Sequence, residues 1–139
     1  MPMPHLLLID DDAQIRRALV RMLGRDFTVH CAADAQSALA MIDGTTRDGA
    51  RMFDVILCDL HLPAMSGHAF YDEVRRRSVH VAERIVIITG SEPAADDAFA
   101  MALGDRYVMK TGPLSALVTR LRHVALSSGA MRCAPLNAA

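Results

Sequence analysis

The chain has 139 residues, of which 52% are hydrophobic, and a formal net charge of −1; these values predict one globular domain rather than a disordered chain. The near-zero charge provides no electrostatic basis for direct binding to nucleic acid or to an anionic membrane, and no apolar stretch reaches the roughly 18 residues of a membrane span. The three cysteines are an odd number without metal-type spacing, so we expect a reducing, cytoplasmic location.

Strand-like and helix-like segments alternate five times along the chain. Strands are predicted at 6–9, 27–31, 55–58, 85–88 and 107–109. Apolar residues at helical spacing predict helices over 15–23, 35–42, around 70–74, over 98–102 and over 114–124, with Asp12 and Asp34 as N-caps and Gly24 as a stop. Four of the strands are short continuous apolar runs, which are typical of a buried parallel sheet. The pattern therefore predicts an α/β fold, a doubly wound five-stranded parallel sheet with five helices.

Reactive side chains follow four of these strands. The residues are Asp10, Asp11, Asp59, Thr89 and Lys110, and Lys110 is the only lysine among fifteen basic residues. Ligands of open α/β sheets bind outside the carboxyl ends of the strands. Carboxylates, one hydroxyl and one ammonium at that edge suit a divalent metal and a phosphoryl group.

The same residues resemble the receiver domain of two-component response regulators, including chemotaxis regulators and the receivers of hybrid histidine kinases. The resemblance covers residues 6–124 and rests on the acidic cluster after the first strand, the segment 53–67, Thr89, and the segment 107–110. It implies a flavodoxin-like sheet with strand order 2-1-3-4-5. It also implies that Asp59 is the phosphoacceptor, that Thr89 and Lys110 act on the phosphoryl group, and that Tyr107 is the aromatic switch residue. Mg²⁺ would be held by Asp10, Asp11, Asp59 and the backbone carbonyl of His61.

The function implied by this resemblance is that of a phosphorelay module. Asp59 would take a phosphoryl group from a histidine kinase or a histidine phosphotransfer protein, and the surface of the fourth helix, fifth strand and fifth helix would switch and could form a homodimer. The chain would not be an enzyme beyond its own phosphorylation and slow dephosphorylation. We expect the receiver domain to occupy residues 1–126, with 127–139 as a flexible tail or the start of a linker.

The sequence departs from the family pattern at one position, and two alternative functions remain open. Lys110 is followed by Thr111 instead of the usual proline, and we expect a trans bond there because a non-proline cis bond costs about 3 kcal/mol. The first alternative is a degenerate receiver that acts only as an interaction module; the altered loop keeps it open, whereas the intact acidic pair, acceptor, hydroxyl and lysine argue against it. The second is an aspartate-nucleophile phosphatase of the haloacid dehalogenase kind, using the Asp-x-Asp of Asp10 and Asp12. The output partner, and whether the receiver works alone or within a larger protein, are not determined by these residues.

Overall fold

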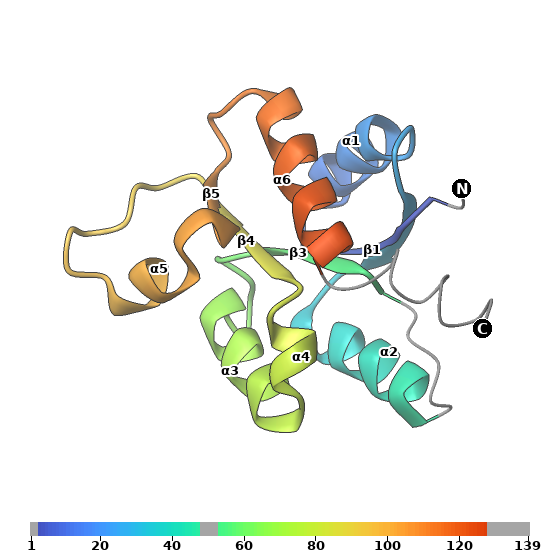
Figure 1. Cartoon of the computed structure of the whole chain (residues 1–139), viewed down its shortest axis with the longest axis horizontal. Helices are drawn as coiled ribbons and strands as arrows, with labels where there is room; N and C mark the ends of the chain where they lie inside the picture. Colours follow the sequence, from blue (N-terminus) through green and yellow to red (C-terminus); the bar gives the residue numbers. More distant parts are fainter. Residues whose placement is uncertain (1–2, 48–52, 128–139) are drawn as a thin grey trace.

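A computed structural model describes residues 3–47 and 53–127. Its central element is a five-stranded sheet, all parallel, in the order β2-β1-β3-β4-β5 (Figure 1). The strands are β1 His5–Ile9, β2 Thr28–Ala32, β3 Val55–Asp59, β4 Ile85–Thr89 and β5 Tyr107–Met109. The predicted fold class and strand order are confirmed.

Helices cover both faces of the sheet (Figure 1). They are α1 Ala13–Leu23, α2 Ala35–Arg47, α3 Gly67–Arg77, α4 Val79–Ala82, α5 Ala98–Leu103 and α6 Leu114–Ser127, with a 3-10 turn η1 at Gly104–Arg106. Side chains alternate between faces along each strand. In β1, Leu7 and Ile9 join the apolar cluster shared with α2 and α3, whereas Leu6 and Leu8 join the cluster shared with α1 and α6. The central strands are buried on both sides, which explains their continuous apolar sequences.

The described residues contain six α-helices, so the predicted number of five is wrong by one. The additional helix, α4, is a single turn whose first residues are capped by the Ser78 hydroxyl, which accepts from the Val81 N–H at 3.3 Å. Four residues are too short to show a helical period, so the sequence pattern did not indicate it. The predicted fourth and fifth helices are therefore α5 and α6. The α2 helix also continues to Arg47, beyond the predicted end at 42, because one interior glycine costs a helix only about 1 kcal/mol.

The predicted N-caps are present. The Asp12 carboxylate accepts from the Gln14 and Ile15 N–H groups at 2.9 and 3.2 Å, and the Asp34 carboxylate accepts from the Ser37 N–H at 2.7 Å. Each cap satisfies backbone donors that have no partner within the helix. In the described part of the chain, none of the helices is long and apolar enough to cross a membrane.

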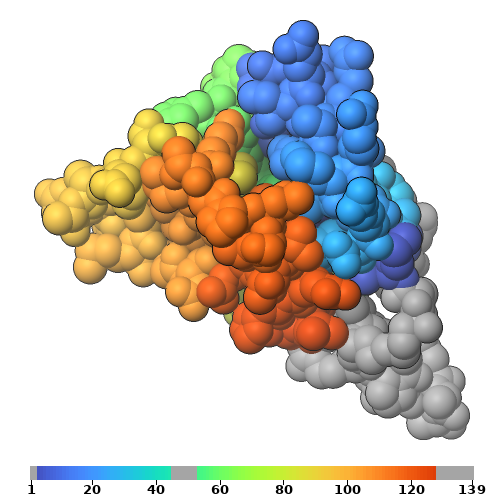
Figure 2. Space-filling model, turned by 90° about the horizontal axis from the view of Figure 1, so that it is seen from above, coloured from blue at the N-terminus to red at the C-terminus, as the bar shows by residue number. Residues whose placement is uncertain are grey.

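The segment between β4 and α5 projects from the body of the molecule (Figures 1 and 2). Residues 90–96 are all exposed. On the face seen in Figure 2, α6 lies between this projection and α1. The loop after β4 therefore has few packing constraints, whereas the strand before it is fully buried.

Gly67 lies against the backbone at the end of β3, and its replacement by alanine should be destabilising. A Cβ atom there would lie 2.6 Å from the Asp59 carbonyl oxygen and 2.9 Å from the Leu60 Cα. Backbone atoms cannot move aside as a flexible side chain can, so we expect Gly67→Ala to lower the free energy of unfolding by about 1–3 kcal/mol. Urea denaturation measures the change.

Gly44 provides the matched control. It lies within α2, and a Cβ atom there would meet nothing within 4 Å. Gly44→Ala should raise stability by about 0.5–1 kcal/mol, because alanine has the higher helix propensity. Equal stability of the two variants would contradict the proposed close approach at Gly67.

Candidate functional site

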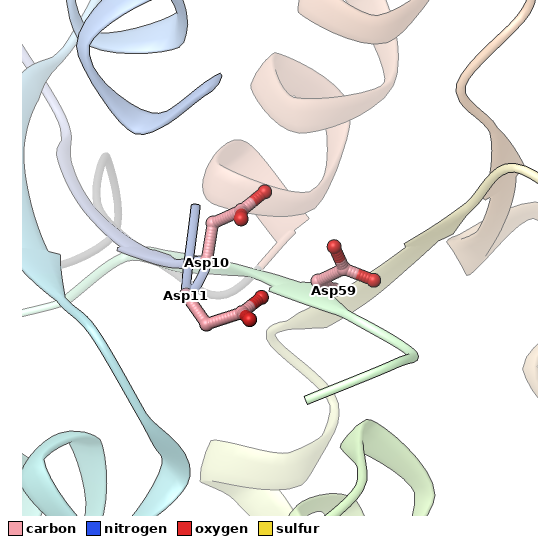
Figure 3. A group of neighbouring side chains, drawn as sticks. All are labelled: Asp10, Asp11 and Asp59. Carbon is pink, nitrogen blue, oxygen red and sulfur yellow. The ribbon is translucent and has the colours of Figure 1, made fainter. Parts of the chain in front are cut away.

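Three carboxylates meet at the carboxyl edge of the sheet. One oxygen from each of Asp10, Asp11 and Asp59 lies within 4.8 Å of the others (Figure 3). Asp10 directly follows β1, Asp59 ends β3, and the two strands pair with Ile9 opposite Cys58. Strand pairing therefore places together residues that are 49 positions apart in the chain. Asp10 and Asp59 are buried and Asp11 is exposed, so the cluster opens to solvent on one side.

Asp10 has the least favourable surroundings of the three. Its Oδ1 accepts from the Asp12 N–H at 2.9 Å, whereas its buried Oδ2 has no hydrogen-bond partner among the described residues. Burial raises the pKa of the Asp10 carboxyl, opposed by the Asp12 N–H and reinforced by the negative charge of Asp59. Buried acceptors of this kind need a partner. A hard divalent cation that prefers carboxylate oxygens, such as Mg²⁺, fits this donor set.

Asp10→Asn should stabilise the protein in the absence of divalent cations. Because its pKa is raised above the ordinary value of 3.8, ionised Asp10 lowers stability at neutral pH, and the neutral amide removes a penalty on the order of 1 kcal/mol. The gain in the free energy of unfolding should be complete at pH values above the raised pKa. It should vanish at pH values below the ordinary pKa, where wild-type Asp10 is protonated in both the folded and the unfolded state. Urea denaturation in EDTA across this pH range measures it. Asp11→Asn, at an exposed position, is the control, and an equal gain there would contradict the argument.

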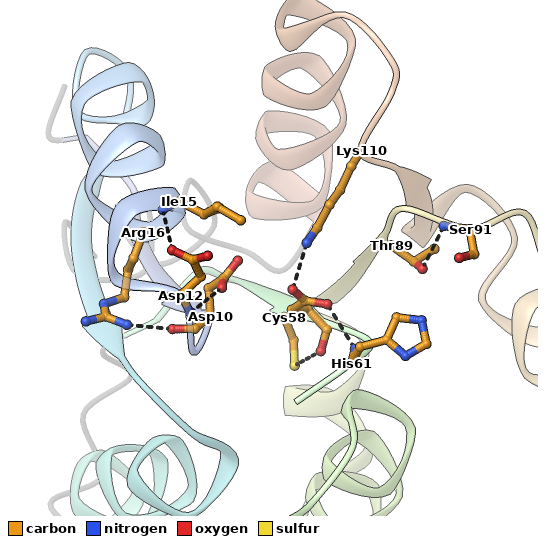
Figure 4. A network of polar contacts seen from close by, with 10 residues as sticks. Asp10, Asp12, Ile15, Arg16, Cys58, His61, Thr89, Ser91 and Lys110 are labelled. Atoms are coloured by element: carbon orange, nitrogen blue, oxygen red, sulfur yellow. Dashed lines mark hydrogen bonds and ion pairs between the residues drawn. The ribbon is translucent and has the colours of Figure 1, made fainter. Parts of the chain in front are cut away.

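The Asp59 carboxylate is held on both oxygens. The Lys110 ammonium donates to Oδ2 at 2.8 Å and the His61 N–H donates to Oδ1 at 2.9 Å (Figure 4). Burial lowers the pKa of Lys110, but the hydrogen bond and negative charge of Asp59 outweigh it, so the pKa is raised. The ammonium is therefore charged at neutral pH. An acceptor and a cation in contact at a partly open site can receive a phosphoryl group and stabilise its oxygens.

The remaining predicted site residues are Thr89, Tyr107 and His61, and neither the Thr89 nor the Tyr107 side chain is hydrogen-bonded to Asp59 among the described residues. Thr89 ends β4 and is buried, and its Oγ1 accepts from the Ser91 N–H at 3.2 Å (Figure 4). Tyr107 packs edge-on against Phe99 with ring centroids 6.2 Å apart, and burial, with the charge of Asp97, raises its pKa. The backbone N–H of His61 contacts Asp59. The role of its carbonyl as a metal ligand stays a prediction.

The loop after Lys110 has only trans peptide bonds, like the other described residues, so the expected trans bond at Thr111 is confirmed. The Lys110 N–H donates to the Thr89 carbonyl at 2.7 Å, and the Gly112 N–H donates to the Met109 carbonyl at 3.3 Å. These bonds anchor the loop on both sides of Lys110. The missing proline therefore does not prevent the ammonium from reaching Asp59.

The sequence analysis did not predict a role for Arg16, which contacts the loop between β1 and α1. The Arg16 guanidinium donates to the backbone carbonyl of Asp10 at 2.7 Å (Figure 4). The only signal for it was a cation in the first turn of α1, close in sequence to the aspartates. That signal is weak, because a basic residue on a helix is usually a solvated surface residue.

Comparison with known proteins identifies the family to which these site residues belong. The sequence model of the family described as "Response regulator receiver domain" matches residues 6–122. The chain belongs to this family. As a receiver, it shares 32% identity with the transcriptional regulatory protein AruR of Pseudomonas aeruginosa, over 93% of this chain and 55% of that protein. It shares 30% identity with the sensory transduction protein RegX3 of Mycobacterium tuberculosis, over 91% of this chain and 53% of that protein. The receiver thus spans about half the length of these curated relatives.

Solved structures show the same fold. A response regulator receiver domain protein from Clostridium thermocellum superposes with a TM-score of 0.78 at 21% identity, covering 93% of this receiver and 99% of that chain. The chemotaxis response regulator CheY4 of Vibrio cholerae superposes with a TM-score of 0.68 at 27% identity, covering 88% and 99% respectively. The predicted family is confirmed, and with it the assignment to two-component response regulators.

Proposed function

We propose that this receiver is a phosphoacceptor in a two-component phosphorelay. Asp59 accepts a phosphoryl group from the phosphohistidine of a histidine kinase or histidine phosphotransfer protein, in the cytoplasm. The observation that carries this proposal is the position of the Asp59 carboxylate, in contact with Lys110 Nζ at 2.8 Å and within 4.8 Å of oxygens of Asp10 and Asp11. The nucleophilic carboxylate of Asp59 therefore has the Lys110 ammonium on one side and the carboxylates of Asp10 and Asp11, which can bind a metal ion, on the other. Phosphoryl transfer requires such an arrangement of nucleophile and positive charge.

Each site residue has its own role in the proposed phosphoryl transfer. Asp10, Asp11, Asp59 and the His61 carbonyl would hold Mg²⁺, which supplies positive charge that offsets the repulsion between a carboxylate and a phosphoryl group. An Asp59 oxygen forms a bond to phosphorus as the bond from phosphorus to the donor imidazole breaks, and the imidazole nitrogen takes up a proton. The Lys110 ammonium then contacts a phosphoryl oxygen instead of the free carboxylate.

The phosphoryl group also provides the switch. It brings about two negative charges and strong acceptors to the edge of β3. The Thr89 hydroxyl, bonded in this structure only through its acceptor side to the Ser91 N–H among the described residues, then donates to the phosphoryl group. Movement of Thr89 shifts the exposed segment 90–96 and α5, and Tyr107 follows through its contact with Phe99. The surface made of α5, β5 and α6 is the expected output and dimerisation surface.

The rival functions have less support. In the phosphatase hypothesis Asp12 would be the second catalytic aspartate, but its carboxylate caps α1 through two backbone N–H groups. The degenerate receiver would lack part of the site, whereas the acidic cluster and the Lys110–Asp59 contact are both in place. Phosphotransfer to Asp59 is therefore the function that the geometry supports best.

Intact mass spectrometry after incubation with acetyl phosphate tests the proposal. We expect one phosphoryl adduct in Mg²⁺ and none in EDTA, with peptide mapping after borohydride reduction assigning it to Asp59. Turnover of p-nitrophenyl phosphate with the phosphate on Asp10 would favour the phosphatase instead. No adduct with acetyl phosphate or with a phosphorylated histidine phosphotransfer protein would favour the interaction module. An unchanged solution mass with beryllofluoride would contradict dimerisation alone.

A further inference from the structure

A cavity lies at the end of the sheet opposite to the end that carries Asp59. It has a volume of about 430 Å³ and is lined by residues of the short helix α4, the segment before β4, the end of α5, the turn η1 and α6. Since α4 and η1 precede the parallel strands β4 and β5, the cavity is at the amino edge of the sheet, whereas Asp59 and Thr89 end their strands. The volume lies within the range of about 300–1,000 Å³ that is typical of pockets for small organic ligands.

Basic side chains outnumber acidic ones around this cavity. Three arginines and two histidines face two carboxylates, those of Glu83 and Asp105, and the basic lining residues are His80, Arg84, Arg106, Arg120 and His123. Among the lining residues, guanidinium groups outnumber carboxylates by three to two. The whole chain carries a net charge of −1, so the cavity is a local exception to the charge of the protein.

Arg106 is oriented by two backbone carbonyls and an aromatic ring. Its Nη1 donates to the carbonyls of Ala82 and Ile85 at 2.9 and 3.1 Å, and its guanidinium carbon lies 6.0 Å from the ring centroid of Tyr71. Within the described part of the chain, no carboxylate forms an ion pair with this half-buried residue. A guanidinium has five donors in a planar fork. Carbonyls fix its orientation but leave its charge uncompensated, and partly buried charges are normally paired.

The α6 helix supplies cations on the other side. Arg120 and His123 are three residues apart and therefore lie on one helix face. The Arg120 contact with Asp105 is long, at 3.5 Å, and the Asp105 side chain is 82% exposed, so this pair is weak. Arginine forks match the geometry of phosphate and carboxylate groups.

We propose that this cavity binds a small organic anion through a phosphate or carboxylate group. The ligand's charged group would contact Arg106 and Arg120, and its organic part would occupy the rest of the cavity against Leu103 and Val124. Arg106 directly precedes β5, which carries Tyr107, so an occupant would act on the strand next to the switch. Binding does not depend on phosphorylation of Asp59, and the site is thus separate from the proposed function.

Backbone amide NMR of the full chain tests the proposal. Adenosine monophosphate, citrate and inorganic phosphate are titrated separately in EDTA at constant ionic strength. We expect saturable shifts at residues 103–106 and 120–124 with at least one organic anion, and weaker binding of inorganic phosphate, which lacks an organic body. A response to adenosine monophosphate alone would identify a phosphate site, and a response to citrate alone a carboxylate site.

The decisive variant is Arg120→Gln, with Arg122→Gln as its matched control. Arg122 is two residues away on α6 and pairs with Asp26 at 3.5 Å, outside the cavity. Arg120→Gln should weaken binding about tenfold or more, because one charge-assisted contact is lost, whereas Arg122→Gln should not. Equal effects of the two variants, or no saturable shift with either organic anion, would overturn the proposal.

Discussion

Asp59→Asn is expected to abolish the phosphoryl adduct completely. Asparagine has nearly the same shape as aspartate, but its amide is not a nucleophile toward phosphorus. One of the two donors around the carboxylate can retain its contact, since the single amide oxygen still accepts from the Lys110 ammonium or the His61 N–H. The loss would then report chemistry and not unfolding. The measurement is intact mass after incubation with acetyl phosphate and Mg²⁺.

Asp54→Asn is the control for this result. Asp54 is also a buried carboxylate next to β3, and its Oδ2 accepts from the His5 N–H at 2.8 Å. It lies at the amino end of β3, away from the acidic cluster. This variant should form the adduct as the wild type does. An adduct that persists in Asp59→Asn, or disappears in both variants, would show that Asp59 is not the acceptor.

Lys110→Met should slow phosphorylation by acetyl phosphate by about 10²–10³-fold, the usual effect of removing one preorganised donor from a developing anion. Methionine keeps most of the length and apolar stem of lysine but has no charge. Because Lys110 lies within the same electrostatic cluster as Asp10 and Asp11, its removal makes the carboxylate cluster more negative. Mg²⁺ should therefore bind more tightly to the variant although phosphorylation is slower.

These opposite changes distinguish an electrostatic role from a structural one. A Lys110→Met variant with a damaged site would lose Mg²⁺ affinity and phosphorylation together, and that outcome would contradict the proposed role. Arg122→Met, which removes an exposed cation from α6, should change neither quantity. Isothermal titration with Mg²⁺ and the rate of adduct formation provide the two measurements.

The Lys110–Asp59 contact also predicts a dependence of stability on alkaline pH. The pKa of Lys110 is raised above its ordinary value of 10.5, so the contact stabilises the folded state below that value. This contribution is lost as the pH rises through the raised pKa. The stability difference between wild type and Lys110→Met should therefore shrink in that range.

The sequence by itself determined the strands and the residues at their ends. Apolar runs such as Leu6–Ile9 can only be buried, and a parallel sheet places all carboxyl ends at one edge, so the five reactive residues were predicted without coordinates. The same local information predicted the caps at Asp12 and Asp34, because capping depends on residues two or three positions away. What the sequence pattern lacked was the one-turn helix α4, whose four residues are too few to show a helical period.

Only the tertiary structure decided how these residues meet. The lack of a partner for Asp10 Oδ2 in the described part of the chain depends on side-chain directions and strand neighbours. The same holds for the Arg16 bond to the Asp10 carbonyl and for the 2.8 Å contact of Lys110 with Asp59. The cavity around Arg106 joins segments from α4 to α6, which no sequence period connects. Periodicity reports whether a residue is buried, whereas the partner of a buried charge is set by the packing of elements that are distant in the chain.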